Sequence, residues 1–360
     1  MRVSHFREWY ERYERHISAV TILIAFFVDS ITLVRVDVFL TNFLLFLYLA
    51  IVAFGILVVN LYEAGKLRWL SYEWYAWITL AMQFSFGGLF GRFLIYYSRA
   101  GLFASSWPFL VLLAGLLVGN EFAKKYYTRV VVQVGFFFLA LFAYMIFFVP
   151  IVVGRMGDAI FLLSGSVSLL IVGFFIHILM RLLPTKIKEG GRALIVTVAS
   201  VFIVFNALYF ANLIPPLPLA LRDAGVFHSI TPTSTGFIGL HEESTAANDY
   251  LARYATVHLV LGERLYVYSA VFAPTNFDTD ITHEWQWYEP QTKRWESLDR
   301  ITFNIVGGQD RGYRGYTFKS NLRAGLWRVN ILTASGQLVG REQINVVLVP
   351  KKVALVKENL

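Results

Sequence analysis

The sequence predicts two folds in one chain: a membrane all-α bundle of seven transmembrane helices, followed by an all-β, immunoglobulin-like antiparallel sandwich. Three observations predict this. The 360 residues are 57% hydrophobic and only 16% charged, with a mean hydropathy of +0.56, whereas soluble domains carry about 25% charged residues. Long apolar runs fill residues 17–213. Short runs rich in β-branched and aromatic residues begin at about residue 254.

The predicted organisation has five parts. They are a cytoplasmic N-terminal arm (1–16), the seven-helix membrane domain (17–214), a periplasmic linker (215–252), the β-sandwich (253–349) and a C-terminal tail (350–360). The linker is predicted from its prolines and from the Ser, Thr and Gly content of the stretch SITPTSTGF. No cleavable signal sequence is expected, because no small-residue cleavage site follows the first apolar run.

Seven apolar runs have the length that a membrane span needs, which is roughly 20 helical residues. They lie at about 17–34, 38–61, 74–98, 102–119, 130–153, 159–182 and 193–213. The loops on one side carry about thirteen basic residues, and those on the other side carry about three. This asymmetry predicts a bacterial inner-membrane protein with a cytoplasmic N-terminus. After seven crossings, the β domain lies in the periplasm.

The composition argues against several functions. Cysteine is absent, so the chain has no disulfide and no thiolate metal site. The net charge of +8 lies mainly at the cytoplasmic rim, where anionic membrane lipids are the expected partners, so nucleic-acid binding is disfavoured. No cofactor, metal ligand or catalytic residue is assigned, since neither HExxH nor GxSxG is present. The oligomeric state is not predicted.

Polar residues inside the predicted spans need a reason, because a mid-bilayer charge costs about 2.5–3.5 kcal/mol. Asp29, Arg92 and Asn206 lie at similar depths in the first, third and seventh spans. We expect an Asp29–Arg92 ion pair assisted by Asn206, either as a structural clasp or as part of a substrate pathway or headgroup site. Gly87 and Gly91 form a GxxxG pair, which is typical of a helix-packing face.

Seven short strands are expected in the β domain. They lie near 254–260, 263–273, 281–289, 299–306, 313–320, 325–333 and 338–348, with Ser335-Gly336 as a tight turn. Alternate side chains of a strand share a face. His283, Trp285 and Trp287 therefore share one face, and the tryptophans are expected in the core. The same alternation places Trp327 in the core, whereas Trp295 is expected in an exposed turn.

Several of these residues carry a resemblance. The pattern consists of His283-x-Trp285, a Tyr313-Arg314 strand that ends at Lys319, Gly325-x-Trp327-Arg328-Val329, and Gly336 before a final strand. It resembles an uncharacterised bacterial β-domain family, a domain of unknown function found behind membrane helices or other domains. The resemblance covers about 255–349. It implies a periplasmic β module and assigns no chemistry.

A candidate ligand or partner surface is expected on the sandwich. Its residues are His283, Arg311, Arg314, Tyr316, Arg328 and Trp295. Guanidinium groups bind carboxylates and phosphates, so an anionic glycan, a peptidoglycan stem or a lipid headgroup would suit this surface. The alternative is that the arginines pair with Glu284, Glu289 and Asp310 across strands.

The expected function is non-enzymatic. The chain is interpreted as a membrane anchor that presents a periplasmic β-sandwich to an envelope protein, an anionic glycan or a lipid headgroup. The alternative is a transporter or lipid-handling membrane enzyme with a polar pocket near Asp29, Arg92 and Asn206. A water-accessible cavity reaching Arg92 would favour the alternative, whereas a solid helix bundle favours the anchor.

Overall fold

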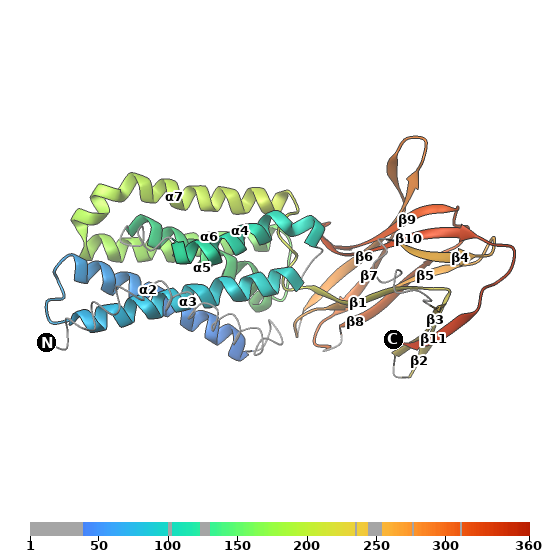
Figure 1. Ribbon diagram of the computed structural model, residues 1–360, viewed down its shortest axis with the longest axis horizontal. Coiled ribbons are helices and arrows are strands. Elements are labelled where there is room, and N and C mark those ends of the chain that lie inside the picture. Colours follow the sequence, from blue (N-terminus) through green and yellow to red (C-terminus); the bar gives the residue numbers. More distant parts are fainter. Residues whose placement is uncertain are drawn as a thin grey trace. The chain divides into compact units, whose positions relative to one another are not determined.

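The computed structural model describes residues 39–99, 103–122, 130–234, 236–243, 254–275, 277–309 and 312–360. The chain divides into two compact units (Figure 1), a helical one that ends at Ile214 and a β-rich one that runs from Pro215 to Leu360. The predicted change from helices to strands near residue 214 is therefore confirmed.

Six helices are described in the helical unit. They are α2 (Phe39–Glu63), α3 (Tyr72–Arg99), α4 (Phe103–Phe122), α5 (Val130–Val153), α6 (Asp158–Leu182) and α7 (Pro184–Phe210). By length and composition, all but α4 could cross a membrane; the apolar stretch described in α4, Ser106–Leu117, is shorter. The expected span at 17–34 lies outside the described residues. Seven spans therefore stay a prediction.

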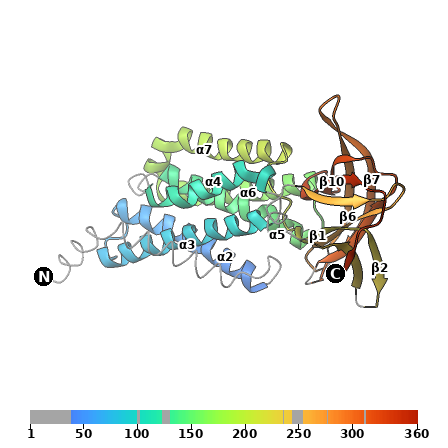
Figure 2. The same ribbon diagram turned by 45° about the vertical axis from the view of Figure 1, so that its right-hand side comes forward.

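The helices lie alongside one another (Figure 2), and α5 packs against α2, α6 and α7. Most of α5 is buried, and Phe142 stacks on Phe202 and Phe205 of α7 with ring centroids 5.8 and 4.9 Å apart. The helix α7 begins at Pro184 rather than near residue 193. The first turns of α7 contain lysine and glutamate. The prediction was based on apolar residues, so it placed the start of this helix too late.

Eleven strands are described in the β-rich unit. They are β1 (Ala220–Phe227), β2 (Ser229–Thr233), β3 (Gly236–Glu242), β4 (Ala255–Leu259), β5 (Leu265–Phe272), β6 (Asp278–Glu289), β7 (Arg294–Val306), β8 (Tyr313–Lys319), β9 (Gly325–Thr333), β10 (Leu338–Leu348) and β11 (Leu355–Asn359). They form three sheets, with strand orders β1-β5-β8, β4-β10-β9-β6-β7 and β11-β3-β2. Pairing is antiparallel except between β4 and β10, which run parallel.

The seven expected strands correspond to β4–β10, but β7 starts earlier than expected. It begins at Arg294, so Trp295 lies in a strand opposite Tyr288 and not in a turn. The pairing of β6 with β7 contains an irregularity between Trp285 and Gln286. A β-bulge inserts an extra residue, so a strand can continue although the alternation of its buried and exposed side chains is interrupted. For this reason the sequence pattern did not predict the first part of β7.

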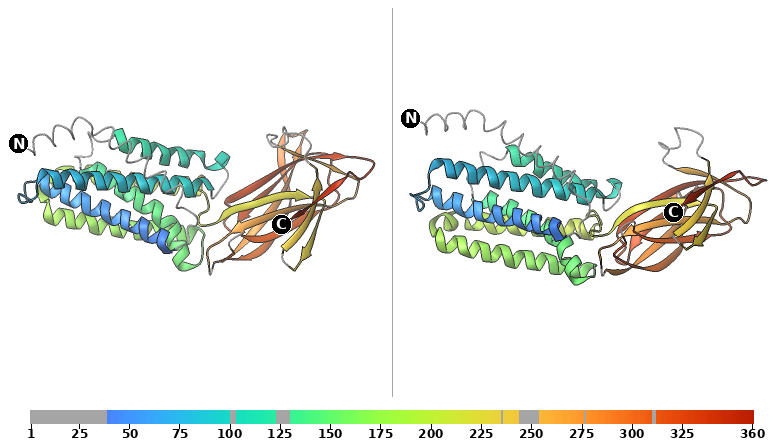
Figure 3. Two further views of the ribbon diagram at one scale, coloured as in Figure 1. Left: turned by 60° about the horizontal axis from the view of Figure 1, so that its bottom comes forward. Right: turned by 90° about the horizontal axis from the view of Figure 1, so that it is seen from below.

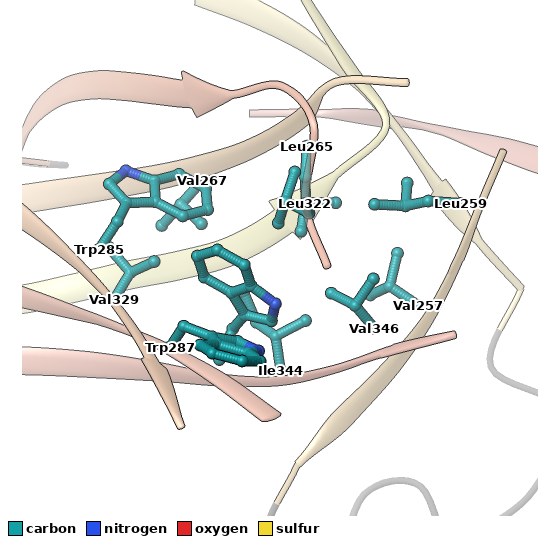
Figure 4. Packing of buried hydrophobic residues seen from close by; sticks show 11 residues of the cluster. Val257, Leu259, Leu265, Val267, Trp285, Trp287, Leu322, Val329, Ile344 and Val346 are labelled. Carbon is teal, nitrogen blue, oxygen red and sulfur yellow. The ribbon is translucent and has the colours of Figure 1, made fainter. Parts of the chain in front are cut away.

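The main core lies between the five-stranded sheet and the β1-β5-β8 sheet. Trp285 and Trp327 are 0% and 1% exposed, so the expected core positions are confirmed. Both belong to a cluster with Val267 of β5 and Val329 of β9 (Figure 4). Along β6, buried and partly exposed residues alternate from Ile281 to Tyr288, as the period of a half-buried strand requires.

The region 215–252, expected as a linker, instead contains β1, β2 and β3, and the expected tail contains β11. The β11-β3-β2 sheet packs on the β1-β5-β8 sheet through Phe227, Ile230 and Tyr268. The strand β11 pairs with β3, and the C-terminus lies beside the yellow strands of this sheet in both views of Figure 3. Pro232 obscures β2 in the sequence, but β2 is an edge strand, where a missing backbone donor is tolerated.

Candidate functional site

The candidate residues of the β domain lie in different layers. His283 lies inside the main core, Arg314 and Tyr316 face the β11-β3-β2 sheet, and Trp295 and Arg328 lie on the outer side of the five-stranded sheet. The structure therefore does not bring these five side chains together into one surface.

His283 is a core residue with 0% exposure. Its Nε2 lies 2.9 Å from Ser269 Oγ, and its Nδ1 lies 2.9 Å from Thr317 Oγ1. Trp285 donates its indole N–H to the same Thr317 oxygen at 3.0 Å. A neutral imidazole with its proton on Nε2 donates to Ser269 and accepts from the Thr317 hydroxyl, so both ring nitrogens are hydrogen-bonded. Burial lowers the pKa of His283 to about 4, so the ring is neutral at pH 7 and links the two sheets.

Arg314 and Tyr316 help to hold the third sheet in place. Arg314 donates from a terminal nitrogen to the backbone carbonyl of Leu360 at 2.9 Å. The ring of Tyr316 meets that of Phe237 edge-on, with centroids 5.4 Å apart. These contacts are structural and internal to the unit. Arg311 lies outside the described residues.

Trp295 and Arg328 belong to a polar surface that we call the outer face. It consists of the side chains on β7, β6, β9 and β10 that point away from the main core. They are Trp295, Ser297, Arg300, Glu284, Gln286, Tyr288, Arg328, Asn330, Arg341 and Gln343. Cross-strand register places these residues in rows, since Gln286 pairs with Ser297 and Arg328, and Glu284 pairs with Arg300.

Glu284 is the central acceptor of the outer face. Its oxygens accept hydrogen bonds from Gln286 at 2.8 Å, Ser297 at 2.9 Å and Asn330 at 3.0 Å. Arg300 Nε lies 3.7 Å away. Arg300 was not among the arginines expected to pair with Glu284, and Arg328 donates to Gln286 instead. Its own hydrogen bonds keep Glu284 in a fixed position.

Arg328 is held by an amide and an aromatic ring. Its Nε donates to Gln286 Oε1 at 2.5 Å, and its guanidinium carbon lies 4.3 Å from the Trp295 ring centroid. Tyr288 packs on Trp295 with centroids 5.2 Å apart. Burial lowers the pKa of Arg328, and the positive charge of Arg341 lowers it further, while Glu284 acts in the opposite direction. Two like charges are therefore close together here.

The predicted intramembrane cluster is described only in part. Arg92 is 3% exposed, and its guanidinium lies 5.2 Å from the Tyr48 ring centroid. Asn206 donates to Phe202 of its own helix at 2.8 Å, and no hydrogen bond joins it to Arg92 in the described part of the chain. Asp29 lies outside the described residues, so the Asp29–Arg92 pair stays a prediction. Gly88 of α3 lies so close to Tyr48 of α2 that an added Cβ atom would come within 2.6 Å of the tyrosine ring. The helix-packing role of Gly87 and Gly91 stays a prediction.

A second polar cluster joins helices of the membrane unit and was not expected. Asn60 of α2 donates to Gln133 of α5 at 2.5 Å, and both are fully buried. Lys186 of α7 donates to Asn60 at 3.3 Å and to Glu63 at 2.7 Å. The sequence could have indicated this cluster, because Asn60 and Gln133 are amides in two very apolar helices, where a polar side chain favours an interhelical hydrogen bond.

Replacing Asn60 with leucine will destabilise the helical unit by about 1–2 kcal/mol, because Gln133 loses a buried hydrogen bond and Lys186 loses a partly buried one. The matched control is Asn206→Leu, since Asn206 bonds only within its own helix among the described residues. We expect this control to change stability by less than about 0.5 kcal/mol. Thermal unfolding in detergent measures both. Equal effects would rule out the interhelical role of Asn60.

Histidine and glutamate side chains join the third sheet to β4. Glu242 of β3 lies 3.0 Å from His228 Nε2 and 2.7 Å from His258 Nδ1. Burial acts to raise the pKa of Glu242, but hydrogen bonds from His258 and His228 outweigh it and lower that pKa. No group of three or more acidic, histidine or cysteine side chains is arranged to hold a metal ion among the described residues.

The outer face lies on strands that match a known domain family. Residues 278–346 match the family "Protein of unknown function (DUF2914)". The DUF2914 region begins with β6 and reaches into β10, so it contains every residue of the outer face. An uncharacterised domain in the C-terminal part of the chain is thus confirmed, over a shorter range than the expected 255–349.

The other comparisons add no function. No curated protein matches the chain. One solved structure, Pseudomonas fluorescens alkylpurine DNA glycosylase AlkC bound to DNA containing an abasic site analog, is similar at 10% identity. The match covers 83% of this chain and 96% of that chain, but its TM-score of 0.21 is too low to carry an argument.

Proposed function

We propose that this protein is a non-enzymatic membrane anchor that presents the DUF2914 region to a partner in the bacterial envelope. The helical unit holds the β-rich unit on the periplasmic side of the inner membrane, and the outer face recognises the partner. The observation that carries the proposal is the outer face itself. It is an ordered network of polar and aromatic side chains on a sheet whose opposite side already forms a complete core.

The distribution of tryptophan supports membrane insertion. Trp69, Trp74 and Trp77 are 80%, 64% and 56% exposed near the loop that joins α2 to α3, and Trp107 is 53% exposed near the start of α4. Tryptophan is enriched at both membrane–water interfaces. The α2–α3 loop also carries Lys66 and Arg68, so we assign it to the cytoplasmic side.

We propose an immunoglobulin-like relationship for the β-rich unit. In such domains a buried tryptophan on strand C packs between the two sheets, where strands B and F face each other. Trp285 on β6 has the corresponding environment, with Val267 of β5 and Val329 of β9 in the same cluster. The neighbouring order β10-β9-β6 corresponds to strands G, F and C.

The packing of α5 favours the anchor over the transporter alternative. Its buried side chains are mostly aromatic and aliphatic along nearly its whole length. A substrate path needs polar groups that converge on a water-accessible cavity. The buried amide of Gln133 instead receives a hydrogen bond from Asn60.

The absence of cysteine permits a clean topology test. In cells with a permeabilised outer membrane, we expect a membrane-impermeant maleimide to label Ser335→Cys, in the turn between β9 and β10. It should label Ala64→Cys, in the α2–α3 loop, only after lysis. The reverse pattern would overturn the proposed orientation.

Occupancy of the outer face is tested with Ser297→Cys, whose side chain is exposed on β7. We expect its maleimide labelling to be at least about fivefold slower in the cell envelope than in the purified protein, because a bound partner restricts access to a site. Ser335→Cys controls for general access and should be labelled at similar rates in both. Equal rates for Ser297→Cys would mean that the outer face has no partner in the envelope.

A further inference from the structure

Arg328 and Arg341 lie near each other on the outer face, and each is held by a neutral amide. Arg328 Nε donates to Gln286, and Arg341 Nε donates to Asn330 Oδ1 at 2.6 Å. An arginine that only stabilises a sheet is usually neutralised by a carboxylate. Here the amide of Gln286 fixes the orientation of the Arg328 guanidinium group without removing its charge.

Arg328 is not neutralised by a carboxylate among the described residues. Its side-chain hydrogen bond goes to the neutral amide of Gln286, and Glu284 already accepts three hydrogen bonds from other side chains. Among the described residues, the two terminal nitrogens of Arg328 have no hydrogen-bond acceptor. An anion bound there would offset the repulsion between the two guanidinium groups.

The opposite end of β6 has a different character. Asp278 and Asp280 accept hydrogen bonds from Asn304 at 2.6 and 3.2 Å. The positive charge is therefore confined to one end of the face, next to the aromatic side chains. A ligand that matches this pattern combines an anionic group with a ring that can pack on an aromatic surface.

The surroundings of Arg328 are already ordered for binding. Its guanidinium is stacked on Trp295, and Trp295 is packed against Tyr288. A stacked, hydrogen-bonded arginine loses little side-chain freedom when it binds a carboxylate through its planar fork. Gln343, which pairs with Arg328 across the strands, adds an amide group nearby that suits the hydroxyl groups of a sugar.

We propose that the outer face binds a carboxylated glycan. The carboxylate is held by the terminal nitrogens of Arg328, and the sugar ring lies along Trp295 and Tyr288. This inference rests on the proposed function and specifies the partner of the same surface. A sugar polymer fits better than a phospholipid headgroup, because the face is an extended sheet with aromatic rings beside the charge.

The test uses the full chain in phosphatidylcholine nanodiscs, with octagalacturonate as the probe and maltooctaose as the neutral control. We expect octagalacturonate to bind, with an affinity that falls as salt is raised, and maltooctaose not to bind. Arg328→Gln should weaken binding by about tenfold or more, the effect of losing charge-assisted hydrogen bonds. Trp295→Ala should weaken it as well.

The matched control is Arg323→Gln, which removes the same charge. Arg323 also stacks on a tryptophan, Trp287, at 4.9 Å, but it does not belong to the outer face. We expect its affinity to change by less than about twofold. If Arg328→Gln does not fold, Arg328→Lys is the alternative variant. It retains the positive charge but lacks the planar guanidinium group that binds a carboxylate through two nitrogens, so it should still weaken binding.

Three results would overturn the inference: no binding of octagalacturonate, equal loss for Arg328→Gln and Arg323→Gln, or Arg328-dependent binding only to phosphatidylglycerol nanodiscs. The last result would assign the face to a lipid headgroup. Protection of Ser297→Cys in cells separates the two levels of the proposal. If Ser297→Cys is protected in cells but octagalacturonate does not bind, the outer face still recognises a partner, and only the carboxylated glycan is wrong. If Ser297→Cys is labelled in cells as fast as in the purified protein, the proposed recognition function is wrong as well.

Discussion

Replacing Trp285 with alanine will lower the free energy of unfolding of the β-rich unit by about 3–5 kcal/mol. The indole is fully buried between the two sheets of the main core, against Val267 and Val329. Alanine removes this apolar contact and leaves a cavity that the surrounding strands cannot fill. Thr317 also loses the indole N–H that it accepts at 3.0 Å. Because domains are stable by about 5–15 kcal/mol, this loss removes a large part of the total.

Amide hydrogen exchange in β5 and β9 of the full chain measures this effect without interference from the helical unit. The matched control is Trp295→Ala, because Trp295 lies on the outer face and is only partly buried. We expect the control to cost about 1 kcal/mol or less. If both variants lost the same protection, Trp285 would not be the centre of the core.

Alternation along one strand was enough to predict the core of the β domain. In β6 the residues from Ile281 to Trp287 change face at every step, and both their neighbours β7 and β9 pair along this stretch. A half-buried strand imposes a period of two on its hydrophobic residues, so the buried face can be deduced from the sequence. The role of Trp285 follows from this alone.

The third sheet could not be deduced in this way, although β5 carries a signal of it. The sequence LYVYSAVF is buried on both sides in the structure. A strand with apolar residues on both faces requires a covering layer on each. The covering strands β2 and β3 are interrupted by proline and glycine, and β11 has four exposed residues among its five. Each of them gains its stability from packing rather than from its own propensity.

The arrangement of the candidate residues could not be predicted from the sequence. Trp295 and Arg328 are neighbours on the outer face, whereas Arg314 and Tyr316 are on the other side of the main core. The spacing of residues along a strand shows which of its side chains point to the same face, for each strand separately. Which strands are neighbours, and which face a third layer covers, depends on long-range pairing that spacing does not encode.

Acidification will destabilise the β-rich unit through His283. An unfolded histidine has a pKa of about 6.5, whereas burial lowers the pKa of His283 to about 4 in the folded protein. Between these values the unfolded chain binds a proton that the folded chain does not bind. The contribution of His283 is therefore complete above pH 6.5 and falls by about 3 kcal/mol as the pH drops to 4. Protonation would place a charge between Ser269 and Thr317, and no carboxylate of the described residues lies beside the ring to balance it.

Glu342 changes stability in the opposite direction, so a comparison with variants is needed. Burial, followed by the negative charge of Asp223, raises the pKa of Glu342 from 4.5 to about 7. An unfolded glutamate is ionised above about pH 4.5, and stability is therefore lost as the pH rises toward 7. The two slopes oppose each other between pH 4.5 and 6.5, and the parent protein will show a shallow curve. Glu342→Gln should steepen its decline on acidification.

His283→Gln should show the complementary change in the same urea-unfolding series. It is less stable than the parent at pH 7, because glutamine does not reproduce both hydrogen bonds to Ser269 and Thr317. Its disadvantage should shrink as the pH falls to 4, since glutamine has no proton to gain. A difference between parent and variant that stays constant from pH 7 to 4 would mean that folding does not lower the pKa of His283. The buried environment described for the ring between Ser269 and Thr317 would then be incorrect.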